Sequence, residues 1–191
     1  MPRRVGCWIT LGFCLSLPWL SVVRAGNPLA DVNLVVGQKQ LDSREWEPAE
    51  EQDGFALESS WGGTNWPVLI AADLTYHGGD ESVEGIKFEG ETIELALGVR
   101  RSFRIGRFRP YAGGGVALIN AEVTASGFGD SESDDDSATG FWVGGGLLWR
   151  IGSHLNLGLA ARFSDAEVTL AGIDGDAGGV QYGIAIGWAW H

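Results

Sequence analysis

A two-residue alternation of large and small side chains constrains this chain more than any other feature of its sequence. In residues 180–190 every even-numbered position holds a large apolar residue, and every odd-numbered position holds Gln, Gly or Ala. Residues 93–99 and 155–163 alternate in a similar way. Because successive side chains of a β-strand point to opposite faces, this pattern predicts strands. The same alternation, in a less regular form, predicts five more strands, at residues 32–36, 55–61, 66–76, 111–119 and 141–151.

The connections between these eight predicted strands are alternately short and long. The short ones lie around residues 62–65, 101–107 and 151–154, and the long ones at about 41–53, 77–90, 124–139 and 165–179. Short turns at one end and long loops at the other are typical of bacterial transmembrane barrels, whose short turns face the periplasm. We therefore predict an all-β fold, a transmembrane eight-stranded antiparallel up-and-down β-barrel over residues 26–191, with four long external loops.

The small side chains on one face of the strands favour a membrane barrel over a soluble eight-stranded ligand carrier. Such a carrier points its large apolar residues inward around a ligand and its polar residues outward. Here the outer face would then consist of Gly, Ala and isolated charges, which is too sparse for a solvated exterior. A membrane barrel needs the reverse, an apolar outer band and a polar, tightly filled lumen. The large face is therefore expected to contact lipid.

Residues 1–25 differ from the rest of the chain and predict a secretory signal peptide. Arg3 and Arg4 precede a run without charges over residues 5–23, and Val23-Arg24-Ala25 provides small residues at the −3 and −1 positions of a cleavage site. An uncleaved anchor is the alternative. Cleavage after Ala25 would remove both cysteines, Cys7 and Cys14, so the mature chain is expected to hold no disulfide and no cysteine-bound metal.

The charge balance restricts the classes of partner. The chain carries 25 Asp and Glu against 13 Lys and Arg, a formal net charge of −12. Nucleic acid binding needs clustered basic residues, so no nucleic acid partner is predicted. Five acidic residues fall in the third long loop and form a candidate weak divalent-cation site, although their spacing matches no EF-hand and a charge run is usually a solvated loop. These residues are Asp130, Glu132, Asp134, Asp135 and Asp136. We predict no specific metal site and no cofactor.

Tryptophan is concentrated at the end of the predicted barrel that carries the short turns. Trp and Tyr favour the membrane–water interface, because their rings are apolar and their N–H or O–H groups need a polar partner. We therefore predict an interfacial aromatic girdle at the periplasmic end. Its members are Trp61, Trp66, Trp149, Trp188 and Trp190.

Charged residues on the small face are expected to point into the lumen. An ionised group in a narrow lumen needs a partner, so Arg162 should pair with at least one of the inward carboxylates. The network is either a structural polar core or an ion path, and both interpretations stay open here. The predicted lumen charges are Glu58, Asp73, Glu94 and Arg162 near mid-barrel, Arg100 and Arg150 near the periplasmic mouth, and Lys39 near the outer mouth.

Four segments resemble the small eight-stranded outer-membrane barrels, a group that includes the transmembrane domain of outer membrane protein A, protein X and protein W. They read VNLVVGQKQLDSREWEP, RPYAGGGVALINAEVT, LNLGLAARFSDAEVTL and VQYGIAIGWAW. The resemblance implies a monomer in the bacterial outer membrane, in contact with lipid and lipopolysaccharide and recognised by the barrel-assembly machinery through its C-terminal strand. One departure is that His191 follows Trp190, where such chains usually end in an aromatic residue.

The resemblance specifies architecture better than activity, so three functions are considered. The first is a structural or adhesin-like surface role of the acidic external loops. The second is a narrow channel for ions or small apolar molecules. The third is a lipid A-modifying enzyme, for which the sequence offers little, because His77 and His154 fall at opposite ends of the predicted barrel. We predict that the protein is not an enzyme.

Overall fold

The computed structural model describes residues 28–41, 51–83, 86–127, 130–170 and 173–190. The signal peptide predicted for residues 1–25 and the terminal His191 lie outside these ranges, so cleavage after Ala25 stays a prediction. Most of the first long loop, predicted at residues 41–53, also lies outside them. Within the described residues no helix is long and apolar enough to cross a membrane.

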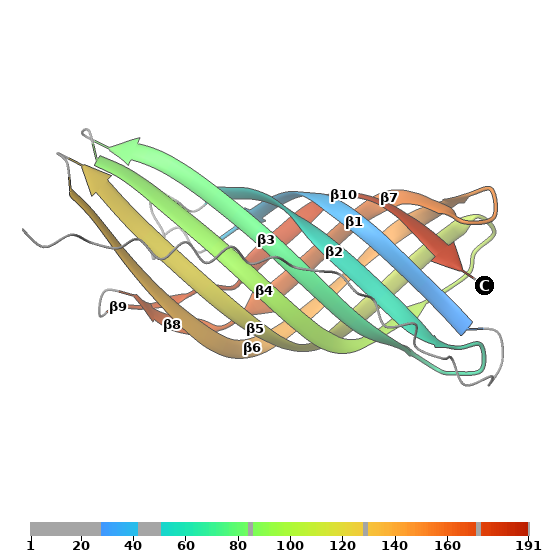
Figure 1. The fold of residues 1–191 in the computed structure, drawn as a ribbon. Coiled ribbons are helices and arrows are strands. Elements are labelled where there is room, and N and C mark those ends of the chain that lie inside the picture. The colour runs from blue at the N-terminus through green and yellow to red at the C-terminus, as the bar shows by residue number, and fades with distance from the viewer. Residues whose placement is uncertain (1–27, 42–50, 84–85, 128–129, 171–172, 191) are drawn as a thin grey trace, which may run out of the picture.

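Eight strands close into one antiparallel barrel (Figure 1). Around the barrel the order is β1-β10-β7-β6-β5-β4-β3-β2, so each barrel strand pairs with the next one along the chain and β10 closes the barrel against β1. This confirms the predicted all-β, eight-stranded fold. The strands are β1 (Pro28–Gln40), β2 (Glu51–Gly63), β3 (Leu69–Val83), β4 (Ile86–Ser102), β5 (Phe108–Gly127), β6 (Asp130–Ile151), β7 (Leu155–Asp165) and β10 (Gly179–Trp190).

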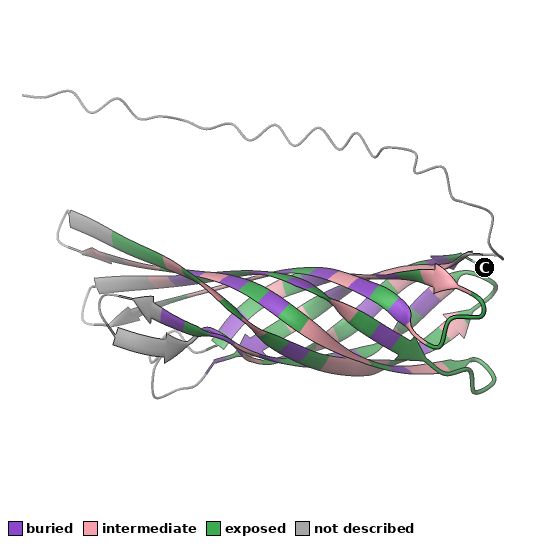
Figure 2. Cartoon of the chain, turned by 90° about the horizontal axis from the view of Figure 1, so that it is seen from below, coloured by how far each residue is buried: buried purple, intermediate pink, exposed green. Residues whose placement is uncertain are grey.

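The alternation of the sequence becomes an alternation of buried and exposed residues along every strand (Figure 2). On β4, Leu95 and Leu97 are about half exposed on the outer wall, whereas Glu94 and Ala96 are buried inside. A water-soluble protein would not leave such a continuous apolar surface uncovered. The arrangement fits an outer wall that contacts lipid and a lumen filled by side chains.

The strands extend further at the outer end than the sequence predicted. β5 has 20 residues and β6 has 22, against 11 in β7 and 12 in β10. The prediction of loops at residues 77–90 and 124–139 was therefore wrong over most of their length. Backbone hydrogen bonds between strands do not depend on apolar side chains, so segments rich in acidic residues and glycine can also pair as strands. On β5, Ala121 and Val123 still alternate with polar residues, and the pairing with β4 and β6 continues past them. In Figure 1 these strands project at the left.

Two smaller corrections concern the predicted 66–76 strand and the fourth long loop. Trp66 lies in the turn before β3, where its N–H donates to the carbonyl of Gly63 at 3.0 Å. Pro67 cannot donate to a strand ladder, which explains the later start of β3 at Leu69. Residues 165–179 contain a small two-stranded sheet, β8 (Glu167–Leu170) and β9 (Ile173–Asp176).

The β8–β9 segment packs over the outer mouth of the lumen. Ala166, Val168 and Ala177 are buried in one apolar cluster with Ile119 and Ala121 of β5. The N–H of Ala177 donates to the carbonyl of Ala166 at 3.0 Å, which joins the two ends of the segment. The segment thus packs against inward-facing residues of β5 at the outer end of the lumen.

The lipid-facing wall yields a stability prediction. Leu97→Arg should lower the free energy of unfolding by about 2–4 kcal/mol, because it would place a charge on the outer wall inside the membrane, and Leu157→Arg should lower it less, because Leu157 pairs with Trp149 of the interfacial girdle. Urea titration of the barrel folded into phospholipid vesicles measures the loss. Ser133→Arg, on the exposed extension of β6, is the matched control and should change stability little. Equal stability of all three variants would mean that the wall does not face lipid.

Candidate functional site

Two arginines share one carboxylate at the centre of the lumen. The alternation of β3, β4 and β7 points Asp73, Arg100 and Arg162 inward from three different strands. Oδ2 of Asp73 lies 2.7 Å from Nη2 of Arg100 and 3.1 Å from Nη1 of Arg162. All three side chains are nearly inaccessible to solvent. One carboxylate therefore bridges two guanidinium groups in a region that excludes most water.

A second carboxylate completes the pairing of each arginine. Arg162 also forms an ion pair with Glu94, and Arg100 lies 3.9 Å from Oε2 of Glu58. Glu58 accepts a 2.8 Å hydrogen bond from the hydroxyl of Tyr111, and Glu94 accepts one of 3.0 Å from the hydroxyl of Ser164. We call the five charged residues Glu58, Asp73, Glu94, Arg100 and Arg162 the lumen network.

Trp142 supports the lumen network from β6, although the sequence analysis did not single it out. Its ring lies 4.5 Å from the guanidinium carbon of Arg162 and 5.8 Å from that of Arg100, within cation–π range. Its indole N–H donates to the carbonyl of Leu97 at 3.3 Å. The alternation would have found this residue, because Phe141 and Val143 face outward and Trp142 must then face inward.

Glycines of the strands make room for these large inward side chains. A Cβ at Gly113 would come within 3.2 Å of the Trp142 ring, and a Cβ at Gly146 within 2.7 Å of the Tyr111 ring. Gly146 thus leaves the space that the Tyr111 ring occupies, and Gly113 avoids a tight contact with the Trp142 ring.

Arg100 and Arg150 were predicted together near the periplasmic mouth, but the structure separates them. Arg100 reaches inward to the lumen network. Arg150 stays at the mouth, where Nε donates to Oδ1 of Asn156 at 2.8 Å and Nη1 donates to the carbonyl of Ser153 at 3.1 Å. A long side chain can lie far from its own Cα, which the alternation of a strand does not reveal.

A second polar group lies above the lumen network, towards the outer mouth. Nζ of Lys39 donates to the carbonyl of Ala177 at 2.7 Å, so it ties β1 to the segment after β9. The hydroxyl of Thr92 donates to Oε1 of Gln52 at 2.9 Å. His77, predicted to lie in a loop, is instead buried in β3, and its ring nitrogens have no hydrogen-bond partner among the described residues.

The five tryptophans of the predicted girdle all lie at the short-turn end with exposed side chains. Trp188 stacks on His154, with ring centroids 5.1 Å apart and an interplanar angle of 9°. His154 also forms a 2.6 Å hydrogen bond with Ser153, in an exposed turn. His77 lies far up β3 from this turn, so the structure does not bring the two histidines into one site.

The acidic residues at 130–136 belong to β6, so the prediction of an acidic loop was wrong. The side chains of Asp130 and Glu132 lie outside the described residues. Asp134 and Asp135 are exposed, and Asp136 is half-buried. Among the described residues no cluster of His, Cys, Asp or Glu has the geometry to hold a metal ion.

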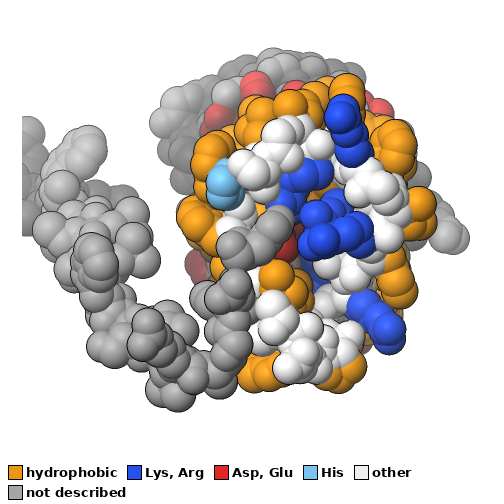
Figure 3. Space-filling model, turned by 90° about the vertical axis from the view of Figure 1, so that its right-hand side faces the viewer, with side chains coloured by type: hydrophobic (Ala, Val, Ile, Leu, Met, Phe, Trp, Pro, Cys, Tyr) orange, Lys and Arg blue, Asp and Glu red, His pale blue; other side chains and the backbone are white. Residues whose placement is uncertain are grey.

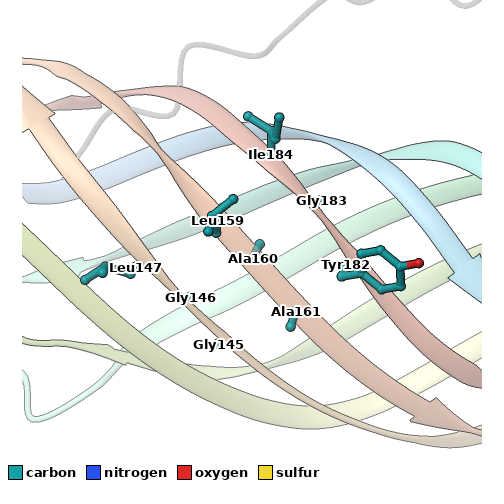
Figure 4. A pocket seen from close by; sticks show the side chains of 9 residues that line it. All are labelled: Gly145, Gly146, Leu147, Leu159, Ala160, Ala161, Tyr182, Gly183 and Ile184. Atoms are coloured by element: carbon teal, nitrogen blue, oxygen red, sulfur yellow. The ribbon is translucent and has the colours of Figure 1, made fainter.

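The outer wall is indented where small residues replace the large ones. A groove of about 560 Å³ runs over β6, β7 and β10 (Figure 4). Gly145 pairs with Ala161, and Ala161 pairs with Tyr182, so two small residues lie side by side on the outer face. Leu147, Leu159 and Ile184 border them. The groove belongs to the lipid-facing surface and does not open the lumen.

The shared carboxylate predicts strong coupling within the lumen network. Arg162→Ala should lower the free energy of unfolding by about 3–5 kcal/mol, because it leaves Asp73 and Glu94 buried without this cation. Denaturant titration in vesicles measures the loss, and Arg101→Ala, at an exposed position of β4, is the control. In a double-mutant cycle with Glu94→Gln, the two losses should be non-additive by about 0.5–3 kcal/mol. Strict additivity would show that the two residues do not interact.

Comparisons with known proteins agree with this architecture. No curated protein matches the sequence closely enough to be significant. Among solved structures, the outer membrane protein OprG from Pseudomonas aeruginosa is 15% identical with a TM-score of 0.57, and 87% of this chain and 97% of that chain align. Ail, the attachment invasion locus protein of Yersinia pestis, is 17% identical with a TM-score of 0.55, covering 87% and 100%. A major outer membrane protein from Thermus thermophilus is 10% identical with a TM-score of 0.59, covering 85% and 98%.

The sequence itself places the chain in a family. Residues 31–189 match the family model of the outer membrane protein beta-barrel domain. The match extends from β1 to β10 and so includes the whole closed barrel. The chain therefore belongs to the outer membrane protein β-barrel family and is an integral protein of the bacterial outer membrane.

Proposed function

We propose that this protein is a surface-interaction barrel, in which a closed membrane core carries an acidic β-sheet extension that contacts cationic partners outside the cell. The observation that carries the proposal is a row of three carboxylates directly opposite one another on this extension. The filled lumen supports it, because a barrel that is closed inside leaves its exposed ends for function.

The length of the strands supports an extension beyond the membrane. A strand needs about 9–11 residues to cross the bilayer, whereas β6 has 22 and β5 has 20. At about 3.3 Å per residue, the surplus continues for some 30 Å along the strand direction. β3 and β4 accompany it, since their pairing continues as far as Val83 and Ile86. Four adjacent strands thus form a rigid platform for binding groups, more rigid than a loop.

The acidic row crosses three of these strands. Glu91 pairs directly with Glu122, and Glu122 pairs directly with Asp135. All three side chains are exposed on the same outward face. Like charges directly opposite each other destabilise a sheet, so folding alone does not favour this row. A cationic partner would remove the repulsion, which is why the row supports recognition of basic groups on another molecule.

A channel and an enzyme are supported less well. The lumen network with Trp142 fills the middle of the lumen, and the β8–β9 segment packs at its outer end. Of the histidines, His77 is buried in the lumen and His154 stacks on Trp188 in an exposed turn. Neither arrangement provides a nucleophile, a base and an orienting acid together, as hydrolysis of lipid A acyl chains would require.

Different parts of the barrel contact different partners in this proposed role. Lipid and lipopolysaccharide surround the barrel, as for other outer-membrane barrels. We propose that the barrel is a monomer and that β10, with Trp188 and Trp190 near its end, is the strand read by the barrel-assembly machinery. Divalent cations would bind only diffusely around the acidic extension.

Neutralising the acidic row should weaken binding to a cationic surface while stabilising the barrel. The variant Glu91→Gln/Glu122→Gln/Asp135→Asn in lipid nanodiscs should bind immobilised poly-lysine several-fold more weakly than the unmodified protein, because the row would no longer attract it. The free energy of unfolding should rise by up to about 1 kcal/mol, because two like-charge pairs are removed.

The matched control removes three charges elsewhere. Glu51→Gln/Asp53→Asn/Glu167→Gln changes exposed residues outside the row and should reduce poly-lysine binding much less. Equal weakening by both triple variants would attribute binding to net charge alone and contradict a role of the row.

A further inference from the structure

The periplasmic mouth of the barrel carries an arginine recess in a chain that is otherwise strongly acidic. A recess of about 310 Å³ is lined by four arginines and two glycines, namely Arg104, Arg107, Arg109, Arg150, Gly106 and Gly152. Figure 3 shows basic side chains at this end of the molecule, with several in the middle of the face and others at its edge among the hydrophobic side chains. The chain has only 13 Lys and Arg in its 191 residues, so four at one recess are a marked concentration.

The recess is built by two turns that are held together. The turn between β4 and β5 is closed by hydrogen bonds in both directions between Ile105 and Phe108, at 2.9 and 3.0 Å. The N–H of Arg150 donates to the carbonyl of Arg107 at 2.8 Å and so joins β6 to this turn. Gly106 and Gly152 have φ angles of 62° and 64°, which other residues rarely adopt. The arginines therefore converge on a defined backbone.

The positive charge of the recess is poorly neutralised within the described part of the chain. There, Arg104, Arg107 and Arg109 form no ion pair with a carboxylate, and Nε of Arg109 is buried without a hydrogen-bond partner. The positive charges of Arg104 and Arg150 repel that of Arg109, and the negative charge of Asp31 partly offsets this repulsion. Like charges that converge without enough counter-charge are stabilised by binding an anion.

We infer that this recess binds the phosphate of an anionic phospholipid headgroup in the inner leaflet of the outer membrane. Guanidinium groups present paired N–H donors that match the oxygens of a phosphate. The same turn presents Phe103, Ile105 and Phe108 with about half or more of their surface exposed. Arg104 and Arg107 alternate with these residues along the turn and so lie at the level of the headgroups, while Arg109 and Arg150, at inward-facing positions of β5 and β6, line the lumen side of the recess. This continuity favours a lipid over a phosphate compound from solution.

The test measures retained phosphatidylglycerol by native mass spectrometry of the barrel released from nanodiscs of phosphatidylcholine with a minor fraction of phosphatidylglycerol. Arg107→Gln and Arg104→Gln should each lower retention about fivefold, the effect of one basic group near an anionic surface. Arg101→Gln is the matched control. Arg101 precedes the same turn, but its guanidinium lies over the Phe103 ring at 5.2 Å, and it does not line the recess. Its loss should lower retention less than twofold.

Three outcomes would overturn the inference. Unchanged retention in Arg104→Gln and Arg107→Gln, with normal heat-resistant migration as the folding check, would show that the recess does not hold the lipid. An equal loss of phosphatidylglycerol in Arg101→Gln would show that any arginine near the membrane attracts the lipid and that the recess has no specific role. Displacement of phosphatidylglycerol by millimolar inorganic phosphate would assign the recess to a soluble phosphate compound. Selective loss without competition by phosphate supports the lipid site.

Discussion

A charged side chain inside a narrow barrel needs an oppositely charged partner beside it, and the rest of this structure depends on the ion pairs that provide these partners. Asp73 is shared by Arg100 and Arg162, and each arginine reaches a second carboxylate, Glu58 or Glu94. With Tyr111 and Trp142 these groups take one or more residues from each of six consecutive strands, β2 to β7. The network can form only when those strands are correctly paired. It therefore links the stability of the core to the closure of the barrel.

The two ends of the barrel have opposite character. At the outer end, four extended strands carry the acidic row of Glu91, Glu122 and Asp135. At the periplasmic end, short turns carry the arginine recess beside exposed apolar residues. The filled lumen separates the two ends, so each can bind its own class of partner. In this account the membrane core is a support, and recognition takes place at its ends.

The sequence alone predicted the strands, the lipid-facing wall and the inward position of the lumen charges, because a single two-residue period determines all three. It did not predict how far β5 and β6 extend, because their outer parts are rich in acidic and hydroxyl side chains, and backbone pairing does not require apolar side chains. Trp142 could have been assigned from the alternation, but the large aromatic residues were all expected outside. The reach of Arg100 to Asp73 depends on side-chain conformation, which no pattern in the sequence reports.

Closure of the lumen is tested most directly by electrical conductance. The purified barrel in a planar lipid bilayer should show no steady ion current, because the lumen network and Trp142 block the path. Arg162→Ala should give measurable openings, since it removes the cation that joins Asp73 to Glu94. A stable, ohmic current through the unmodified barrel would contradict the account and would identify the network as the lining of a channel.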